Sequence, residues 1–239
     1  MSDTRKHRGA HPADRRLFAD NQLPALRTSV GDLSWLLTRG YTKKAALKLV
    51  GDRHALTDRR RLAVSRAACS DQSKEHRAAT NLSAEAVAGE ELIIDGFNLI
   101  ITIEAALSGG VLIHCRDGCL RDLSSVHGSY RSVNETDQAI NLIGTALEDL
   151  QPKSVAWLLD RPISNSGRLA KRIRDLAAEN GWNWTVEVVF NPDSEIIASG
   201  RLVISSDSHL LDETNRWIDF NRYLLDERLK KFWLIDLSG

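Results

Sequence analysis

The sequence predicts an α/β protein, in which a mostly parallel, open sheet with helices on both faces follows a small, basic, all-α domain. From Glu91 onward, short aliphatic runs alternate with amphipathic stretches of helical length, which is the pattern of parallel strands joined by crossover helices. Residues 23–70 lack such runs and instead contain short helical patterns that end at glycines. Charge divides at the same place, because residues 1–90 hold 17 Lys and Arg against 10 Asp and Glu, whereas residues 91–239 hold 15 against 22.

Length and composition limit the class of protein. A chain of 239 residues with 42% hydrophobic content can fill one full core and a small second domain. No run of about 18 apolar residues is present, and the polar N-terminus lacks a signal-peptide pattern, so we expect a cytoplasmic protein with no membrane association. The three cysteines, Cys69, Cys115 and Cys119, are an odd and sparse set that suits a reducing compartment. The sequence leaves open whether the chain forms a homodimer.

The first 90 residues are expected to form three segments. Residues 1–22 lack a repeating apolar face and predict a polar, flexible arm. Residues 23–70 predict a basic helical domain, with Thr42 and Thr57 as helix caps, and residues 71–90 predict a linker that can be helical in part. Basic helices suit the phosphates of a nucleic acid, although a solvated basic surface explains them equally well. The candidate nucleic-acid contacts are Lys43, Lys44, Lys48, Arg59 and Arg60.

The second part, residues 91–239, is expected to form one α/β domain. Its strands are predicted from runs of aliphatic and β-branched residues at 91–95, 111–115, 153–160, 184–190, 200–207 and 230–237. Its helices are predicted from apolar residues at helical spacing at 98–110, 135–150, 166–181 and 210–220.

Three of the predicted strands end on an aspartate, namely Asp95, Asp160 and Asp207. Because the carboxyl ends of parallel strands meet at one edge of a sheet, these side chains are expected to share a site. Asp137 lies in the first turn of its predicted helix, three residues before Ile140 on the apolar stripe, and is expected to point to the same site. Grouped carboxylates suit Mg²⁺ or Mn²⁺. Taken singly, each acid could also be an ordinary turn or cap residue.

Three stretches resemble the PIN-like and NYN-type ribonucleases. "IIDGFNLI" is similar to their first strand, "TDQAI" to their helix-borne aspartate, and "LVISSDSHLLD" to a late strand end. The resemblance implies a PIN-like, Rossmann-like three-layer domain over residues 91–239. The site residues that it implies are Asp95, Asn98, Asp137, Asp160 and Asp207, with Ser205 and Ser206 beside them. With "LLTRGYTKKAALKLVG" ahead of it, the chain also resembles the uncharacterised prokaryotic family of domain of unknown function 434 joined to a PIN-like domain, for which no activity is implied.

Two further regions are candidate substrate contacts. The connection over residues 114–135 is long and carries Arg121 and Arg131, which predicts a phosphate clamp or a lid. Ser164, Asn165 and Ser166 begin a predicted helix and would suit an anion, although helix capping by Ser166 explains them almost as well.

Other residues invite a second interpretation. His114, Cys115 and Cys119 lack the fourth ligand and the paired spacing of a zinc site. Trp182 and Trp184 could stack on bases, but aromatic packing in the core is their ordinary role.

These observations favour a metal-dependent nuclease that cleaves RNA phosphodiester bonds through Asp95, Asp137, Asp160 and Asp207, with Mg²⁺ or Mn²⁺ as cofactor. The alternative is a catalytically inactive PIN-like module that binds RNA or a partner. A phosphotransferase with Asp95 as nucleophile lacks the second aspartate at position 97, which is Phe97. No G-x-G-x-x-G motif supports a dinucleotide site.

Overall fold

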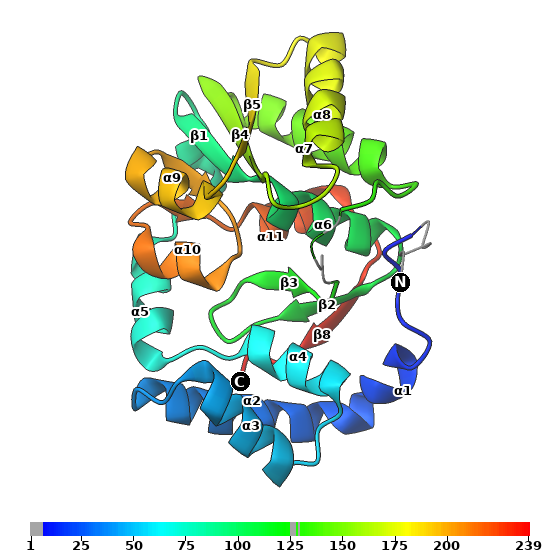
Figure 1. The fold of residues 1–239 in the computed structure, drawn as a ribbon, viewed down its shortest axis with the longest axis vertical. Helices are drawn as coiled ribbons and strands as arrows, with labels where there is room; N and C mark the ends of the chain where they lie inside the picture. Colours follow the sequence, from blue (N-terminus) through cyan, green and yellow to red (C-terminus); the bar gives the residue numbers. More distant parts are fainter. Residues whose placement is uncertain (1–6, 125–127, 129) are drawn as a thin grey trace.

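The computed structural model describes residues 7–124, 128 and 130–239. Figure 1 shows a five-stranded sheet with its helices at one end of the molecule and the first helices of the chain at the other. A three-stranded sheet lies between them. None of the helices in the described ranges is long and apolar enough to cross a membrane.

The five-stranded sheet has the order β5-β4-β1-β6-β7, and all its neighbouring strands are parallel. The prediction of a mostly parallel sheet is confirmed. The chain builds outward from β1 through β4 to β5, then returns to the other side of β1 for β6 and β7. The order therefore reverses between β1 and β6, where doubly wound folds bind their ligands. The strands are β1 (Glu91–Asp95), β4 (Ser154–Asp160), β5 (Trp184–Val189), β6 (Leu202–Ile204) and β7 (Trp217–Ile218).

Helices cover both faces of this sheet, as predicted. In β1, Leu92 and Ile94 join the core with four helices on one face, whereas Ile93 joins a second core with two helices on the other face. Successive side chains of a strand point to opposite faces, so an unbroken aliphatic run suits a strand that is buried on both sides. The first face carries α6 (Gly96–Leu107), α7 (Thr136–Leu150), α8 (Ser166–Asn180) and α11 (Phe220–Arg228), and the second carries α9 (Pro192–Ser199) and α10 (Ser208–Glu213).

Two of the predicted strands belong to a separate three-stranded sheet. Its order is β3-β2-β8, with β2 (Val111–His114) antiparallel to β3 (Leu120–Asp122) and parallel to β8 (Trp233–Asp236). In β2, Leu112 faces the core of the large sheet, while Val111 and Ile113 face the N-terminal helices. The small sheet therefore packs against the core of the large sheet on one face and against the N-terminal helices on the other.

The N-terminal helices share one core with the small sheet instead of forming a domain of their own. Apolar residues of α1, α2 and α4 pack with Val111, Ile113 and Cys115 of the β2 region and with Ile235 and Leu237 of the β8 region. The helices are α1 (Asp14–Leu17), α2 (Leu23–Thr38), α3 (Lys43–Arg53) and α4 (Asp58–Ala67), with a 3₁₀ turn at Asp20–Gln22.

The predicted arm differs from the expectation because its end joins the core, whereas the predicted linker contains the helix that its sequence allowed. Within the predicted arm, Leu17 and Phe18 are buried, and the buried Asp14 accepts two hydrogen bonds from Arg59 at 2.9 and 2.8 Å. Within the predicted linker, residues form α5 (Asp71–Thr80) and a 3₁₀ turn (Ala84–Val87), and α5 packs against α10. These contacts join residues that are far apart in the sequence, so the pattern within each segment does not reveal them.

The predicted helix over 210–220 was also wrong in part. The chain instead ends α10 at Glu213, forms β7 and begins α11 at Phe220, with Asp219 as the cap that accepts the Arg222 N–H. The helix α9 was not predicted, although Asn191 caps it and Pro192 occupies its first position.

Candidate functional site

The carboxyl ends of β1, β4 and β6 open into a cavity of about 400 Å³. Five aspartates line it. Four come from strand ends of the large sheet or from α9, and we call them the pocket acids: Asp95, Asp160, Asp193 and Asp207. The fifth, Asp122 of β3, accepts a hydrogen bond from Thr102 and pairs with Arg66. Three cations share the lining, which also includes amide and hydroxyl groups: Lys43, Arg66, Arg121, Asn98, Ser206 and Ser208. The cavity lies at the reversal of strand order, the position predicted from the strand-end aspartates.

Asp95 enters the pocket because the chain turns sharply after β1. Gly96 begins α6 directly, and a Cβ atom at this position would lie 2.6 Å from Leu159 Cδ2 and 3.0 Å from the Leu158 carbonyl oxygen. Only glycine avoids this overlap without a shift of the neighbours. The Asp-Gly pair is thus needed for the strand to end on a carboxylate and continue at once into a helix.

The end of β6 is tied to the end of β1 by side-chain hydrogen bonds. Ser205 Oγ donates to Asp95 Oδ2 at 2.9 Å and accepts the Asp207 N–H at 2.9 Å. Asn98 Oδ1 accepts from the N–H and the Oγ of Ser206 at 2.9 and 2.8 Å. Asn98 and both serines therefore hold Asp95 and Asp207 at one end of the pocket.

Asp207 also has the capping role that its position before a helix suggests. Its Oδ1 accepts the N–H groups of His209 and Leu210 at 2.8 and 3.3 Å, at the start of α10. The cap fixes the side chain at the rim of the cavity, where it remains part of the lining.

The pocket acids destabilise one another's charged forms. Burial, and then the charge of Asp207, raise the pKa of Asp95 to about 7. Burial followed by the neighbouring Asp193 raises the pKa of Asp160, and burial followed by Asp207 raises the pKa of Asp193. A proton or a cation in the pocket would relieve this repulsion.

Asp137 does not reach the pocket, and the prediction that it does was wrong. It lies exposed at the start of α7, where Arg172 Nε and Nη2 donate to its two oxygens at 2.8 and 2.7 Å. Ile140 is buried as predicted, but the inward residue of the first turn is Thr136, which donates to the buried Glu104. Asp193 of α9 stands among the pocket acids instead.

Lys43 is the cation that the pocket leaves available. It begins α3, and its side chain makes no hydrogen bond or ion pair with any residue in the described part of the chain. Lys43 is an exposed residue, and partial desolvation, followed by the charge of Arg121, lowers its pKa. Arg66 instead donates to the carbonyl oxygens of Asp122 and Ser124.

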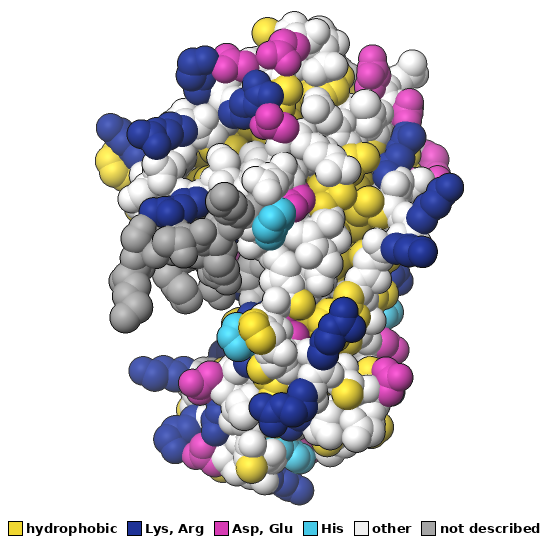
Figure 2. All heavy atoms as spheres, turned by 90° about the vertical axis from the view of Figure 1, so that its right-hand side faces the viewer, with side chains coloured by type: hydrophobic (Ala, Val, Ile, Leu, Met, Phe, Trp, Pro, Cys, Tyr) yellow, Lys and Arg dark blue, Asp and Glu magenta, His cyan; other side chains and the backbone are white. Residues whose placement is uncertain are grey.

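The other predicted nucleic-acid contacts lie outside the pocket lining. Arg59 is held by Asp14, and Arg60 donates to the Leu17 carbonyl oxygen and to Gln22. Lys44 is exposed, and Lys48 is paired with Asp52 one turn away. On the face shown in Figure 2, acidic side chains are interspersed with Lys and Arg over both ends of the molecule.

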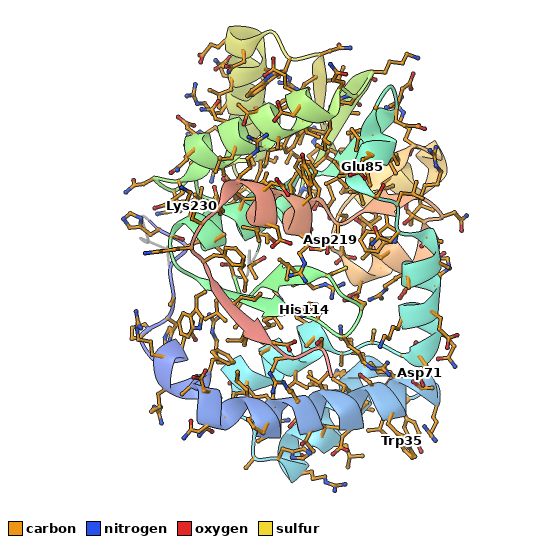
Figure 3. All side chains as sticks on the ribbon, turned by 180° about the vertical axis from the view of Figure 1, so that it is seen from behind. Trp35, Asp71, Glu85, His114, Asp219 and Lys230 are labelled. Atoms are coloured by element: carbon orange, nitrogen blue, oxygen red, sulfur yellow. The ribbon has the colours of Figure 1, made fainter. Side chains whose placement is uncertain are left out.

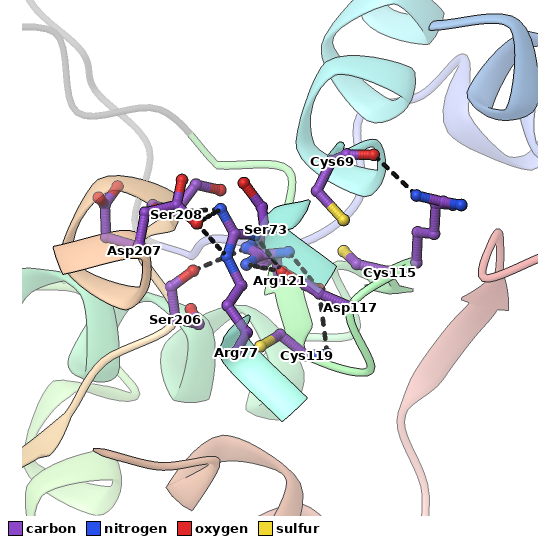
Figure 4. Close-up of polar contacts among 12 residues, drawn as sticks. Cys69, Ser73, Arg77, Cys115, Asp117, Cys119, Arg121, Ser206, Asp207 and Ser208 are labelled. Carbon is purple, nitrogen blue, oxygen red and sulfur yellow. Dashed lines mark hydrogen bonds and ion pairs between the residues drawn. The ribbon is translucent and has the colours of Figure 1, made fainter. Parts of the chain in front are cut away.

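Arg121 lines the pocket as part of a buried ion cluster, formed by Arg77, Asp117 and Arg121 (Figure 4). Asp117 accepts from Arg77 Nη1 at 2.5 Å and from Arg121 Nη1 and Nη2 at 2.9 and 2.6 Å. Arg121 Nε donates to the Ser206 carbonyl oxygen at 2.7 Å, and Arg77 Nη2 to that of Ser208 at 2.9 Å. The two arginines thereby anchor the backbone on both sides of Asp207.

The predicted clamp or lid over residues 114–135 is in part the β2–β3 hairpin, and residues 125–127 and 129 lie outside the described residues. Arg131 is exposed and is not among the pocket-lining residues. The 164–166 segment braces this connection, since Asn165 Nδ2 donates to the Tyr130 carbonyl oxygen at 2.8 Å and the Ser164 N–H donates to that of Gly128 at 3.0 Å. It does not line the pocket.

The cysteines and tryptophans have structural roles. Cys69, Cys115 and Cys119 are free and buried. Trp182 stacks on Trp184, with ring centroids 4.5 Å apart.

Asp219 is a further half-buried acid, which Figure 3 shows where α11 begins near the small sheet. Burial raises its pKa to about 6.

The donors of the pocket match a hard cation in kind. Carboxylate, amide and hydroxyl oxygens are the ligands that Mg²⁺ and Mn²⁺ prefer. Within residues 7–124, 128 and 130–239, however, no group of three or more His, Cys, Asp or Glu side chains stands close enough together to hold a metal ion.

Comparison with known families gives two adjacent matches. Residues 25–79 match a family described as "Protein of unknown function (DUF434)", as the sequence resemblance indicated, and residues 84–223 match "Domain of unknown function (DUF5616)". The chain belongs to the DUF5616 family.

A relative of this DUF5616 protein is the "Uncharacterized protein MJ0935" of Methanocaldococcus jannaschii, which is 32% identical over 184 residues, or 77% of this chain and 88% of the relative. No solved structure matches the chain. The pocket acids all lie within the DUF5616 match, whereas Lys43 and Arg66 lie within the DUF434 match. Both matched regions therefore contribute to the same cavity.

Proposed function

We propose that this protein is a metal-dependent nuclease that cleaves RNA phosphodiester bonds, with a PIN-like domain as its catalytic part. The observation that carries the proposal is the pocket at the carboxyl edge of the parallel sheet, which is lined by the pocket acids and by Lys43, a lysine whose side chain has no partner among the described residues. The sequence resemblance to PIN-like and NYN-type ribonucleases agrees with three of these acids, Asp95, Asp160 and Asp207.

The proposed cofactor is Mg²⁺ or Mn²⁺, with the pocket acids as the residues that would hold it. When bound, the ion would supply an activated water and positive charge against the leaving oxygen of the phosphodiester. The raised pKa values of Asp95, Asp160 and Asp193 support a cation here, because burial, and then a neighbouring carboxylate, disfavour the charged form of each acid and a bound cation would favour it. Without a cation the same charge would repel an anionic phosphate.

Lys43 is the proposed contact for the substrate phosphate. A lysine ammonium group offers three donors on a compact charge, and this one lines the same cavity as the acids, with no competing protein partner for its side chain among the described residues. The phosphate would contact Lys43 in the cavity that the pocket acids line. The helical region thus completes the site.

The test is cleavage of labelled single-stranded and structured RNA by the purified protein, with Mg²⁺, with Mn²⁺ and with EDTA. Asp95→Asn and Asp207→Asn should each lower the rate by at least about 100-fold, because each removes a pocket charge with little change in shape. Asp137→Asn is the matched control, since Asp137 lies outside the pocket, and it should cleave at the wild-type rate. Cleavage that needs no metal, or equal activity in Asp95→Asn, contradicts the proposal.

A second candidate is a catalytically inactive PIN-like module that binds RNA or a partner. The specific observation in its favour is that the described residues hold no ready group of three metal ligands, while Asp207 is engaged as a helix cap. RNA binding that persists in EDTA and in Asp207→Asn, together with no cleavage under any metal condition, would favour this candidate.

A further inference from the structure

An exposed aromatic ring and an arginine form a pair at the ends of β4 and β5. Phe190 is 70% exposed, and the guanidinium carbon of Arg161 lies 4.6 Å from the centre of its ring. The two strands bring them together, since Asp160 is in register with Val189 and the Arg161 N–H donates to the Val189 carbonyl oxygen at 2.7 Å.

This pair borders the pocket through its neighbours in the chain. Arg161 directly follows Asp160, and Phe190 precedes Asp193 by three residues, at the start of the turn into α9. The pair therefore lies at the edge of the sheet that carries Asp160, and the chain reaches Asp193 in α9 three residues after Phe190.

The protein makes little other use of the pair. Phe190 belongs to none of the hydrophobic cores, and the exposed Arg161 forms no ion pair with the part of the chain that the structure describes. A single exposed ring is common on a protein surface, but this ring carries a guanidinium group on one side and follows strands that lead to two of the pocket acids.

We propose that Phe190 and Arg161 form a base-binding subsite beside the pocket, and that the substrate of this protein is single-stranded. This inference rests on the proposed function, and it adds the class of substrate. An unpaired nucleobase next to the scissile phosphate stacks on the open part of the Phe190 ring, while Arg161 supports the ring and offers positive charge to the strand. In a duplex both faces of each base are already stacked, so a base reaches the ring only after leaving the helix, at a cost of its own.

Other aromatic residues do not offer the same subsite. Trp182 and Trp184 are half-buried and stack on each other. Trp35 is 55% exposed and has Arg39 at 3.6 Å from its ring centre, but it projects from α2 at the opposite end of the molecule from the large sheet (Figure 3). Trp35 and Arg39 form the same kind of aromatic–arginine pair away from the pocket, so a substitution of Trp35 is a matched control.

The experiment measures binding of a fluorescein-labelled, mixed-sequence, single-stranded RNA to the full chain by fluorescence anisotropy, with Ca²⁺ in place of Mg²⁺. The same strand annealed to its complement is the second probe. Phe190→Ala should weaken single-strand binding by about 5- to 100-fold, whereas Phe190→Trp should keep it. Trp35→Ala should bind as the wild type does, and the affinity for the duplex should not change in Phe190→Ala.

Each result bears on one proposal or on both. Single-strand binding by Phe190→Ala within twofold of the wild type, or an equal loss for both probes, overturns the subsite. If the wild type cleaves RNA while Phe190→Ala binds and cleaves normally, the subsite fails and the nuclease proposal stands. If binding depends on Phe190 but no metal supports cleavage, the nuclease proposal fails and the subsite stands. A wild type that binds neither probe overturns both.

Discussion

Replacing Asp117 by asparagine tests how the protein positions Asp207. The Asp117 side chain is fully buried, and its partners Arg77 and Arg121 are only 3% and 8% exposed. Asparagine keeps the shape but leaves two buried guanidinium groups without their shared counter-charge, a loss of about 3–5 kcal/mol for a buried pair. Because Arg77 also pairs with Asp212, we expect the lower part of that range, about 3 kcal/mol.

The assay is urea denaturation at neutral pH, with RNA cleavage measured in parallel. The proposed RNA cleavage should fall as well, because Arg77 and Arg121 hold the backbone at Ser208 and Ser206. The control is Asp175→Asn, which breaks an exposed pair with Lys171 and should cost less than about 0.5 kcal/mol. A loss below about 1 kcal/mol in Asp117→Asn would refute the reasoning.

The effect of Asp117 should also depend on pH. Burial raises its pKa, but the charges and hydrogen bonds of Arg121 and Arg77 outweigh burial and hold the pKa below the ordinary value of 3.8. A carboxylate with a lowered pKa stabilises the fold fully above its unfolded pKa, and this contribution is lost as the pH falls below it. The difference between wild type and Asp117→Asn should therefore be constant near neutrality and shrink below about pH 4.

Two further predictions concern stability, and urea denaturation measures both. Gly96→Ala should lower the free energy of unfolding by about 1–3 kcal/mol, because its Cβ would overlap Leu159 and the backbone behind it. Gly31→Ala, in open space within α2, should raise the free energy of unfolding by about 0.5–1 kcal/mol. Changes of the same sign in the two variants would contradict this interpretation. Asp219 has a pKa raised from 3.8 to about 6, so the wild type should lose up to about 3 kcal/mol as the pH rises from about 4 to above 6. Asp219→Asn keeps a cap and should remove this loss, so that it is more stable than the wild type at about pH 7 and equal to it at about pH 4; a difference that does not vary with pH would count against it.

The sequence predicts best where the local pattern and the final environment agree. The aliphatic runs at β1 and β4 are buried on both faces, so their composition alone marks them as central strands. The location of their terminal aspartates can then be predicted as well, since the carboxyl ends of parallel strands lie at one edge of the sheet. Three of the four pocket acids were predicted in this way.

The remaining features depend on distant contacts. The strand β8 has the same aliphatic pattern as a strand of the large sheet, and only its pairing with β2 places it elsewhere. Asp14 is held by Arg59, which is 45 residues away, and a polar segment such as α5 packs through the buried Arg77. Asp193 could have been suggested by the Asn-Pro start of α9 after a strand, whereas Asp137 was misplaced because Thr136 takes the inward position.

The boundary between the two family matches lies between residues 79 and 84, yet it does not divide the folded molecule. A fragment starting there would keep the large sheet but expose Val111, Ile113, Ile235 and Leu237, which the first helices now cover. Such a fragment would present a bare apolar surface to water and tend to aggregate. We therefore expect a fragment that starts at this boundary to be insoluble, because β8 near the end of the chain packs against the N-terminal helices.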